Sequence, residues 1–314
     1  MKPSMLLTFI LLSAFLGAGT SAQDELFTVI ACSGKVFLSG SDTSRWTLLS
    51  TGGKVLKGNR IKTGNNCYLG LCHINGRTLE ILKAGLFSAD ELSENLKAEN
   101  NSVTKKLTDF LVNEIVVKNK SKEMKYISAV ARQNLTYIDK DFPVFSVIID
   151  STVTFRWYPA KDVRLYAFRL LGPSSNTVLI KETPESTLSV NIAGLNLEPG
   201  KPYRWLVFNT EDPSVSSDSS VIMVLSRSDL AAINDSLEAL RSDLSDSLSP
   251  LQQIMEATFF ENNKMNLKAL ECYNHAISLT EQVPEFQKKY LLFLLRAGLF
   301  RRAQVLAEKW NIEK

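Results

Sequence analysis

The sequence predicts a multidomain chain, in which two successive all-β units are followed by an α-helical segment. Residues 27–92 and 144–225 contain short runs of β-branched and aromatic residues separated by Gly, Asn and Pro turn signals, which is typical of all-β units. After residue 226, leucines recur at three- and four-residue spacing, which indicates amphipathic helices. A chain of 314 residues with 45% hydrophobic residues fits about two to three globular domains.

Residues 1–22 have the organisation of a secretory signal peptide. Lys2 precedes an apolar run that ends in the small residues Thr20-Ser21-Ala22. Because this run is shorter than the ~20 apolar residues that span a bilayer, we expect cleavage after Ala22, with retention as an N-terminal anchor as the alternative. No later stretch of the sequence is long and apolar enough to cross a membrane. The mature chain is therefore expected in the periplasm or cell envelope, or secreted.

The charge pattern and the cysteines restrict the partners that the chain can have. The formal net charge is +3, and lysines alternate with acidic residues without forming a basic stripe, which argues against nucleic acid. Four cysteines are too few for a disulfide scaffold in a chain of this length. Cys32 can pair with a cysteine of the later strand after export, and Cys67 is the candidate. The alternative is that all four are small buried hydrophobic residues.

Within residues 27–92, the pair Asn75-Gly76 is the strongest turn signal. A two-residue type I′ hairpin turn needs positive φ at both positions, and this pair accepts it. Leu69, Leu71 and His73 then share one face of the preceding strand, which we take as inward. His73 is expected to be a hydrogen-bonded core histidine rather than a ligand.

This unit resembles the periplasmic FecR-type domain in several short motifs. The matching segments are Gly34-Lys35-Val36, Trp46, Gly53-Lys54-Val55-Leu56, Gly58-Asn59-Arg60-Ile61-Lys62-Thr63-Gly64, Leu69-Gly70-Leu71 and Asn75-Gly76. Asn59 and Asn75 stand where the family usually has aspartates, a conservative change in turns. The cytoplasmic segment of the iron-dicitrate regulators has no counterpart here, so the resemblance implies the fold and not the transcription-regulating role.

The connector, residues 93–143, is expected to be partly helical. Ser88 and Glu91 have the spacing of a capping box, which predicts a helix start. Apolar residues at helical spacing then predict an amphipathic helix over residues 104–117. The lysine-rich residues 118–125 are expected to be a solvated loop, with contact to an anionic polymer as the alternative.

The second β unit, residues 144–225, has six or seven strand-like runs at short spacing, which predicts a β-sandwich. Two motifs, residues 155–159 around Trp157 and residues 197–203 ending in Tyr203, resemble those of fibronectin type III and Ig-like domains. The resemblance implies that Trp157 is buried between two sheets and that the Tyr203 hydroxyl bonds nearby backbone.

The C-terminal third is expected to be helical throughout. Residues 226–248 predict an amphipathic helix that packs within the chain, with a coiled coil as the alternative. Ser249, Pro250 and Gln252 predict the start of the next helix. Residues 249–314 resemble tetratricopeptide repeats, in which small and aromatic residues let paired helices approach closely. The matching residues are Ala257, Phe260, Ala269, Tyr273, Ala276 and, one repeat later, Ala303, whereas Ala307 and Trp310 depart from the motif.

The repeat-like helices are the expected site for a partner protein. In paired-helix repeats the partner-facing positions lie on the first helix of a pair, which points to Gln253, Glu256, Asn263 and Lys264. The alternative is that these helices only cap the sandwich.

A catalytic function is not expected. The two histidines, His73 and His275, are far apart, and the sequence has no paired-cysteine metal spacing, phosphate-binding loop or nucleophile elbow. Asp139 and Asp141 are close acids, but both lie beside turn formers. We therefore expect no catalytic residues, metal or cofactor. The predicted function is an exported bacterial envelope adaptor or scaffold that binds another envelope protein, or the cell wall. The alternative is a FecR-like sensor that acts with a membrane partner.

Overall fold

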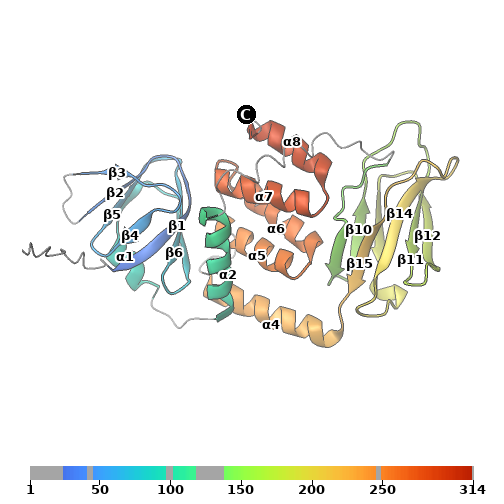
Figure 1. Cartoon of the computed structure of the whole chain (residues 1–314), viewed down its shortest axis with the longest axis horizontal. Helices are drawn as coiled ribbons and strands as arrows, with labels where there is room; N and C mark the ends of the chain where they lie inside the picture. The colour runs from blue at the N-terminus through green and yellow to red at the C-terminus, as the bar shows by residue number, and fades with distance from the viewer. Residues whose placement is uncertain (1–23, 41–44, 97–101, 118–137, 245–248, 313–314) are drawn as a thin grey trace, which may run out of the picture.

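The computed structural model describes residues 24–40, 45–96, 102–117, 138–244 and 249–312. Two β-rich units lie at the two ends of the molecule, and the C-terminal helices lie between them (Figure 1). The coarse prediction of β-sheet units followed by a helical segment is therefore confirmed. The predicted signal peptide, residues 1–22, and the lysine-rich residues 118–125 lie outside the described residues.

The first β unit consists of two four-stranded antiparallel sheets and a short helix. The inner sheet has the strand order β4-β1-β6-β7, and the outer sheet has the order β3-β2-β5-β8. The strands are β1 (Glu25–Ser33), β2 (Val36–Ser39), β3 (Thr47–Leu48), β4 (Lys54–Leu56), β5 (Arg60–Thr63), β6 (Tyr68–His73), β7 (Thr78–Ile81) and β8 (Gly85–Ser88). A core that includes Val29, Val36, Ile61 and Leu69 fills the space between the sheets.

Helix α1 (Ala89–Glu94) begins where the predicted capping box lies, but the cap differs. Ser88 is the N-cap residue, and its side chain makes no capping hydrogen bond. Instead Asp90, in the first turn, accepts a hydrogen bond of 2.8 Å from the Gly58 N–H. The start of the helix was therefore predicted correctly, and the contact that fixes it comes from a distant turn.

The β6–β7 hairpin turn differs from the two-residue type I′ turn that the sequence predicts. Only Gly76 of the pair has positive φ, at 88°. The Gly76 N–H donates to the His73 carbonyl at 2.8 Å, and the His73 N–H donates to the Arg77 carbonyl at 2.8 Å. The Asn75 side chain accepts from the Arg77 N–H and donates to the Leu96 carbonyl. These bonds account for a longer turn, in which glycine alone takes the left-handed conformation.

His73 is a hydrogen-bonded core residue, as predicted. It is 8% exposed, and its Nε2 lies 2.8 Å from the Ser93 hydroxyl. Its ring packs edge-on against Phe27, with 5.0 Å between the ring centroids.

The connector contains helix α2 (Ser102–Val112), which continues as a π-helical turn, η1 (Asn113–Val117). This agrees with the predicted helix over residues 104–117. Leu107, Leu111 and Ile115 are buried, and α2 packs against the C-terminal helices α4 and α5.

The second β unit is a two-layer arrangement, as predicted. A five-stranded sheet has the order β12-β11-β14-β15-β9, in which β9 is parallel to β15, and β10 pairs with β13. The strands are β9 (Phe145–Ile148), β10 (Thr152–Arg156), β11 (Tyr166–Leu171), β12 (Thr177–Thr183), β13 (Thr187–Asn191), β14 (Tyr203–Asn209) and β15 (Ser220–Val224), with a 3-10 turn η2 (Ala193–Leu195).

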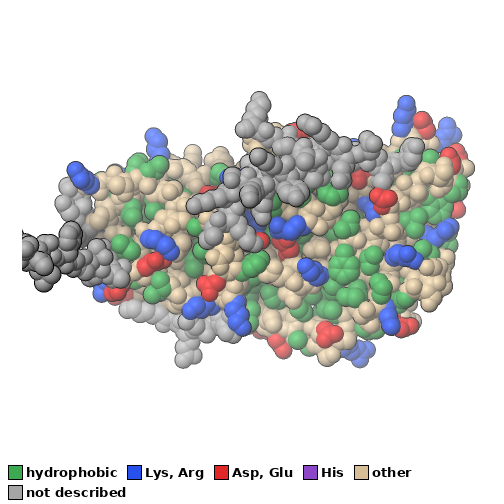
Figure 2. Space-filling model, in the orientation of Figure 1, with side chains coloured by type: hydrophobic (Ala, Val, Ile, Leu, Met, Phe, Trp, Pro, Cys, Tyr) green, Lys and Arg blue, Asp and Glu red, His purple; other side chains and the backbone are tan. Residues whose placement is uncertain are grey.

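The core of this second unit is aromatic. Trp205 is fully buried and packs against Phe142, Phe155 and Phe168. Trp157 is 3% exposed. On the outside, Figure 2 shows hydrophobic side chains gathered on the face of this unit that points towards the viewer.

The helical segment consists of α4 (Arg227–Asp243), α5 (Pro250–Asn262), α6 (Asn266–Leu279), α7 (Pro284–Arg296) and α8 (Phe300–Trp310). Ser249 caps α5 and accepts a hydrogen bond of 3.1 Å from the Gln252 N–H, and Pro250 occupies the first turn, as predicted. Helices α5 and α6 pack as one pair, and α7 and α8 as another. Leu237 and Leu240 of α4 are buried in the core that these helices share, so α4 packs within the chain.

Candidate functional site

The residues predicted to face a partner do not form one exposed surface. Gln253 is 8% exposed and Glu256 is 3% exposed, so the expected exposure of these two is wrong. The Glu256 carboxylate accepts hydrogen bonds from the Arg241 guanidinium at 2.6 and 3.0 Å and from the Gln252 amide at 3.1 Å. Helix α2 also packs on α5. This face of α5 is therefore occupied by the chain itself.

Asn263 and Lys264 lie at the other end of α5, beside the second β unit. Lys264 is exposed and has a left-handed backbone with φ of 61°. Its carbonyl accepts a hydrogen bond of 2.8 Å from the Val147 N–H of β9. The Asn263 side chain donates to the Phe259 carbonyl at 2.8 Å. These two residues therefore lie in the turn between α5 and α6, and this turn contacts β9 of the second unit.

Cys32 and Cys67 are free thiols in the structure. The Cys32 thiol points to the Leu49 carbonyl at 3.5 Å, and burial raises the pKa of Cys32 to about 11. Cys67 is buried at the start of β6. A disulfide between them after oxidation stays a prediction.

The inner sheet of the first β unit is covered on both faces. The outer sheet covers one face, and the C-terminal helices cover the other. All six residues of β6 are buried. Leu69 and Leu71 face the core between the two sheets, whereas Tyr68 and Cys72 face the helices. The Tyr68 ring packs edge-on against Phe286 of α7, with 5.3 Å between centroids. We call this contact between the inner sheet and α5 and α7 the seam.

Glu80 of β7 joins the two sides of the seam. Its carboxylate accepts a hydrogen bond of 3.0 Å from the Leu251 N–H in the first turn of α5, where the helix dipole favours negative charge. The Tyr68 hydroxyl donates to the same carboxylate. Burial, together with this carboxylate, raises the pKa of Tyr68 well above its usual value.

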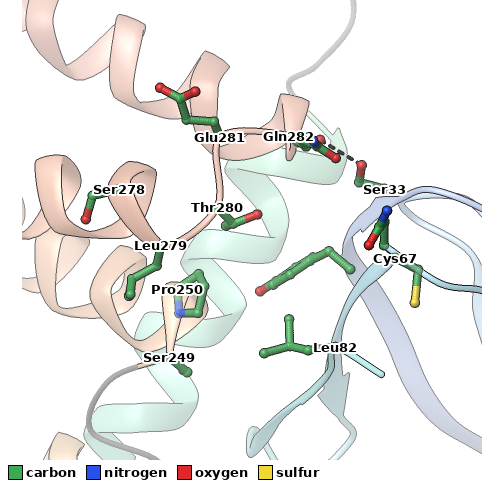
Figure 3. Close-up of a pocket in the computed structure, with 12 residues that line it drawn as sticks. Ser33, Cys67, Leu82, Ser249, Pro250, Ser278, Leu279, Thr280, Glu281 and Gln282 are labelled. Carbon is green, nitrogen blue, oxygen red and sulfur yellow. Dashed lines mark hydrogen bonds between the residues drawn. The ribbon is translucent and has the colours of Figure 1, made fainter. Parts of the chain in front are cut away.

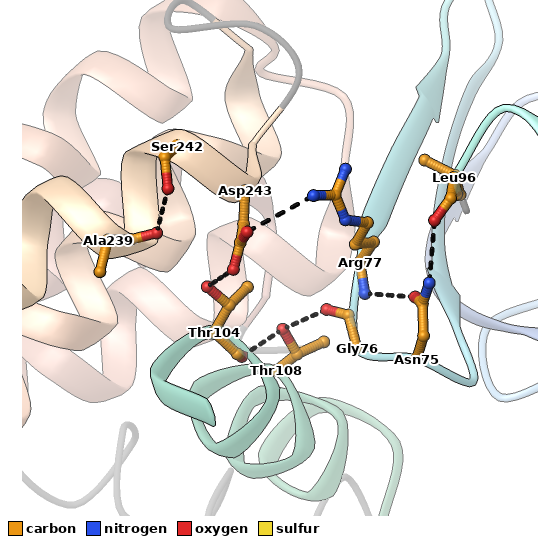
Figure 4. A network of polar contacts seen from close by, with 9 residues as sticks. All are labelled: Asn75, Gly76, Arg77, Leu96, Thr104, Thr108, Ala239, Ser242 and Asp243. Carbon is orange, nitrogen blue, oxygen red and sulfur yellow. Dashed lines mark hydrogen bonds and ion pairs between the residues drawn. The ribbon is translucent and has the colours of Figure 1, made fainter. Parts of the chain in front are cut away.

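A second polar cluster holds the β6–β7 hairpin against α2 and α4 (Figure 4). Asp243 of α4 forms an ion pair with Arg77 at 3.5 Å and accepts a hydrogen bond of 2.6 Å from the Thr104 hydroxyl. The Thr108 hydroxyl donates to the Gly76 carbonyl at 3.1 Å. Polar contacts beside the seam therefore hold the first β unit to the helices, in addition to the apolar packing within the seam.

A cavity of about 700 Å3 opens along the seam (Figure 3). One wall comes from the first β unit and the other from the start of α5 and the α6–α7 loop. Leu82, on the first wall, is 57% exposed, and Leu279, on the second, is 43% exposed. The Ser33 hydroxyl donates to the Gln282 carbonyl across the seam at 2.7 Å. The lining is Ser33, Asn66, Cys67, Tyr68, Leu82, Ser249, Pro250, Ser278, Leu279, Thr280, Glu281 and Gln282.

The lining combines hydroxyl and amide groups with the two exposed leucines. Its one charged side chain, Glu281, forms an ion pair with Lys309. Such a surface can accept an apolar side chain and hydrogen-bond the polar groups beside it. We take this seam cavity as the candidate site.

Sequence reasoning missed the seam. Tyr68, Glu80 and Phe286 were not singled out, although one signal was present. No charged or amide side chain occurs on either face of the run Tyr68-Leu69-Gly70-Leu71-Cys72. This pattern is typical of a strand that is buried on both sides.

Within the described residues, no group of three or more His, Cys, Asp or Glu side chains is arranged to hold a metal ion. None of the described helices combines the length and apolar character of a membrane span.

Comparison with known proteins gives little likeness. No family model matches the chain, and no curated protein matches it. Among the solved structures that match part of the chain is one described as "Crystal Structure of FN3tt", which is 20% identical, with a TM-score of 0.21. The likeness covers 29% of this chain and 98% of that chain.

Proposed function

We propose that this chain is a non-catalytic adaptor or scaffold of the bacterial cell envelope, and that the seam cavity receives a short segment of a partner protein. One observation carries the proposal: Leu82 and Leu279 remain exposed in a cavity whose other lining residues are mostly hydrogen-bonding ones. Partner segments bind such sites with an apolar anchor in the middle and polar contacts around it.

The placement of the helices supports a scaffold. The seam contacts bind the helices to the first β unit, and Val147 and Val144 donate backbone hydrogen bonds to Lys264 and Ala297 on the side of the second unit. The helical segment therefore holds the two β units apart in a fixed arrangement. A partner bound in the seam cavity is thereby held at a fixed distance from any molecule that binds the second unit.

The modules and the location form part of the same proposal. The first unit is proposed to be of the FecR type and the second of the fibronectin type III or Ig-like type. Support for the second is the burial of Trp157 and the hydrogen bond of 2.8 Å from the Glu198 N–H to the Tyr203 hydroxyl. The paired helices α5–α8 are proposed to be tetratricopeptide-like, and the burial of Ala269 and Ala303 supports this. Export rests on residues 1–22.

Site-specific photocrosslinking in the native bacterium tests the adaptor function. A photoreactive phenylalanine analogue at position 82 or 279 is expected to give a discrete crosslinked product with another envelope protein. The matched control is position 180 on the second β unit, where Ile180 is 51% exposed. The proposal fails if positions 82 and 279 give no product, or only the products that position 180 gives.

The location has a separate readout. N-terminal sequencing of the protein from the envelope fraction is expected to begin at Gln23. Protein with an intact Met1 in a membrane fraction would contradict cleavage and favour the anchor.

A further inference from the structure

The outer sheet of the first β unit has one face that nothing in the described chain covers. Val36 and Ile61 point towards the inner sheet and are buried. The opposite face points away from the helical segment, which packs on the inner sheet (Figure 1).

The strand register places an apolar row on this open face. Leu48 lies opposite Phe37, Phe37 opposite Lys62, and Lys62 opposite Leu86. Residues directly opposite on neighbouring strands share a face, so these four side chains form one row across β3, β2, β5 and β8. Leu48 is 67% exposed and Leu86 is 58% exposed. With strands about 4.8 Å apart, the row is about 14 Å long.

An aromatic ring and cations accompany the row. The Lys62 Nζ lies 5.9 Å from the centroid of the Trp46 ring, so Trp46 is on the same face. Arg60 is two residues before Lys62 on β5 and shares its face. Both cations are exposed, and Lys35 and Arg45 are exposed at the borders of the sheet.

The four strands of this face carry no acidic side chain to balance these cations. Strands β2, β3, β5 and β8 read Val-Phe-Leu-Ser, Thr-Leu, Arg-Ile-Lys-Thr and Gly-Leu-Phe-Ser, without Asp or Glu. Two other cations of this unit do meet acids: Lys54 pairs with Glu25, and Arg77 with Asp243. Charge complementarity therefore calls for an anionic partner on the outer face.

We propose that this outer face binds an anionic polysaccharide chain. The flat apolar sides of sugar rings pack on Trp46, Phe37 and the leucines, and the negative groups of the chain bind Arg60 and Lys62. The strands that carry Phe37, Arg60 and Lys62, β2 and β5, are paired on both edges, so a partner reaches these side chains across the flat of the sheet and not as a strand added beside them. The proposal stands apart from the seam cavity, because it uses the other side of the same unit.

Binding of the full mature chain to alginate oligosaccharides, measured by calorimetry, tests the proposal. The wild type is expected to bind alginate in a salt-dependent manner and a neutral dextran much more weakly. The double variant R60Q/K62Q should bind alginate about tenfold or more weakly, because two charge-assisted contacts are lost. The matched control R164Q/K181Q removes two exposed cations from the second β unit and should bind like the wild type. Equal thermal melts for the two variants show that both are folded.

A further variant separates stacking from charge. Trp46→Ala should weaken alginate binding and leave its salt dependence unchanged, because no cation is removed. The proposal is overturned if the wild type binds alginate no better than dextran, or if R60Q/K62Q binds like its control. Poly-glutamate that binds as tightly as alginate would identify an acidic polypeptide as the partner and would also overturn it. The choice of a glycan rests on sugar rings stacking on Trp46. If Trp46→Ala binds alginate as tightly as the wild type, that contact does not exist and the choice of a glycan is wrong.

Discussion

The two β units meet the helical segment in different ways. The first shares one apolar core with it: Ile30, Tyr68 and Cys72 of the inner sheet belong to the same cluster as the buried residues of α5 and α7. The second keeps most of its core to itself, around Phe155 and Trp205, and reaches the core of the helices only at its helix-facing side, through Val147 of β9. Beside this apolar contact, it meets the helices through backbone hydrogen bonds from β9 and through ion pairs such as the one between Arg302 and Asp141.

This difference decides which unit can stand alone. A closed core loses little when a neighbour is removed, whereas a sheet buried on both faces exposes one apolar face to water. We therefore expect the second unit to be the more separable of the two, and the first to depend on the helices that cover its inner sheet.

The largest expected effect follows from removing the helices. A chain that ends at Ser226 should keep the second unit folded and lose the fold of the first, because each uncovered core side chain costs about 1.5–3 kcal/mol. Hydrogen exchange measures this: the amides of β11 and β14 stay protected, and those of β1 and β6 exchange rapidly. Full protection of β6 in the truncated chain would show that the first unit is independent after all.

A core truncation in the second unit should act on that unit alone. Trp205→Ala is expected to lower its free energy of unfolding by about 3–5 kcal/mol, because a fully buried indole leaves a cavity. Hydrogen exchange should show the loss in β11 and β14, with β6 unchanged. Trp310→Ala, at a partly exposed position, is the control and should cost far less. A comparable loss in β6 would mean that the cores unfold together.

A smaller effect is expected where α4 meets α5. Arg241→Ala leaves the buried Glu256 carboxylate without its guanidinium and should cost about 2 kcal/mol in denaturant unfolding. Arg241→Lys keeps the charge without the two-pronged contact and should lose less. Adding Glu256→Gln to Arg241→Ala should recover part of the loss. If the double variant is no more stable than Arg241→Ala, the unpaired Glu256 carboxylate is not what lowers the free energy of unfolding.

The smallest effect is a pH dependence of opposite sign in the two units. Burial lowers the pKa of Lys140, beside the second core, to about 8. Between about pH 8 and 10 the unfolded chain holds the proton that the folded unit has lost, so this unit gains stability as pH rises. Lys140→Met should abolish the gain.

In the first unit the sign reverses. The pKa of Tyr68 is raised in the folded state, so its contribution is fully present below about pH 10 and is lost as the pH rises further. Tyr68→Phe should flatten this alkaline loss. Denaturant titrations at several pH values, followed by hydrogen exchange in each unit, measure both slopes. Parallel slopes in the two units would contradict the separation of the cores.

The sequence predicts the second unit well because its signals are local. Tyr203, Trp205 and Val207 alternate along one strand, so their shared inward face follows from the pleat. The parallel pairing of β9 with β15 does not follow in this way. The chain first forms a bridge between Lys140 and Trp157, just after β10, and then crosses to the other sheet, a change that depends on contacts distant in sequence.

The candidate site was not predictable for the same reason. Gln253 and Glu256 have polar side chains on a helix, which normally indicates an exposed face. Arg241 of α4 covers Glu256, and α2 packs on the same helix, so the burial comes from other elements of the chain. Likewise the two walls of the seam cavity come from opposite ends of the chain. An apolar pattern indicates that a face is covered and not which segment covers it.

The inner sheet also has a consequence for the order in which the protein is made. Ser33 and Gln282, which bond across the seam, are 249 residues apart along the chain. The first unit therefore leaves the ribosome long before α5 and α7 exist to cover its apolar face. Contacts of such separation form slowly, and an uncovered sheet face is prone to aggregate. The second unit can fold as soon as β15 has been made, so we expect the N-terminal unit to complete its fold last and to be the part most exposed to aggregation.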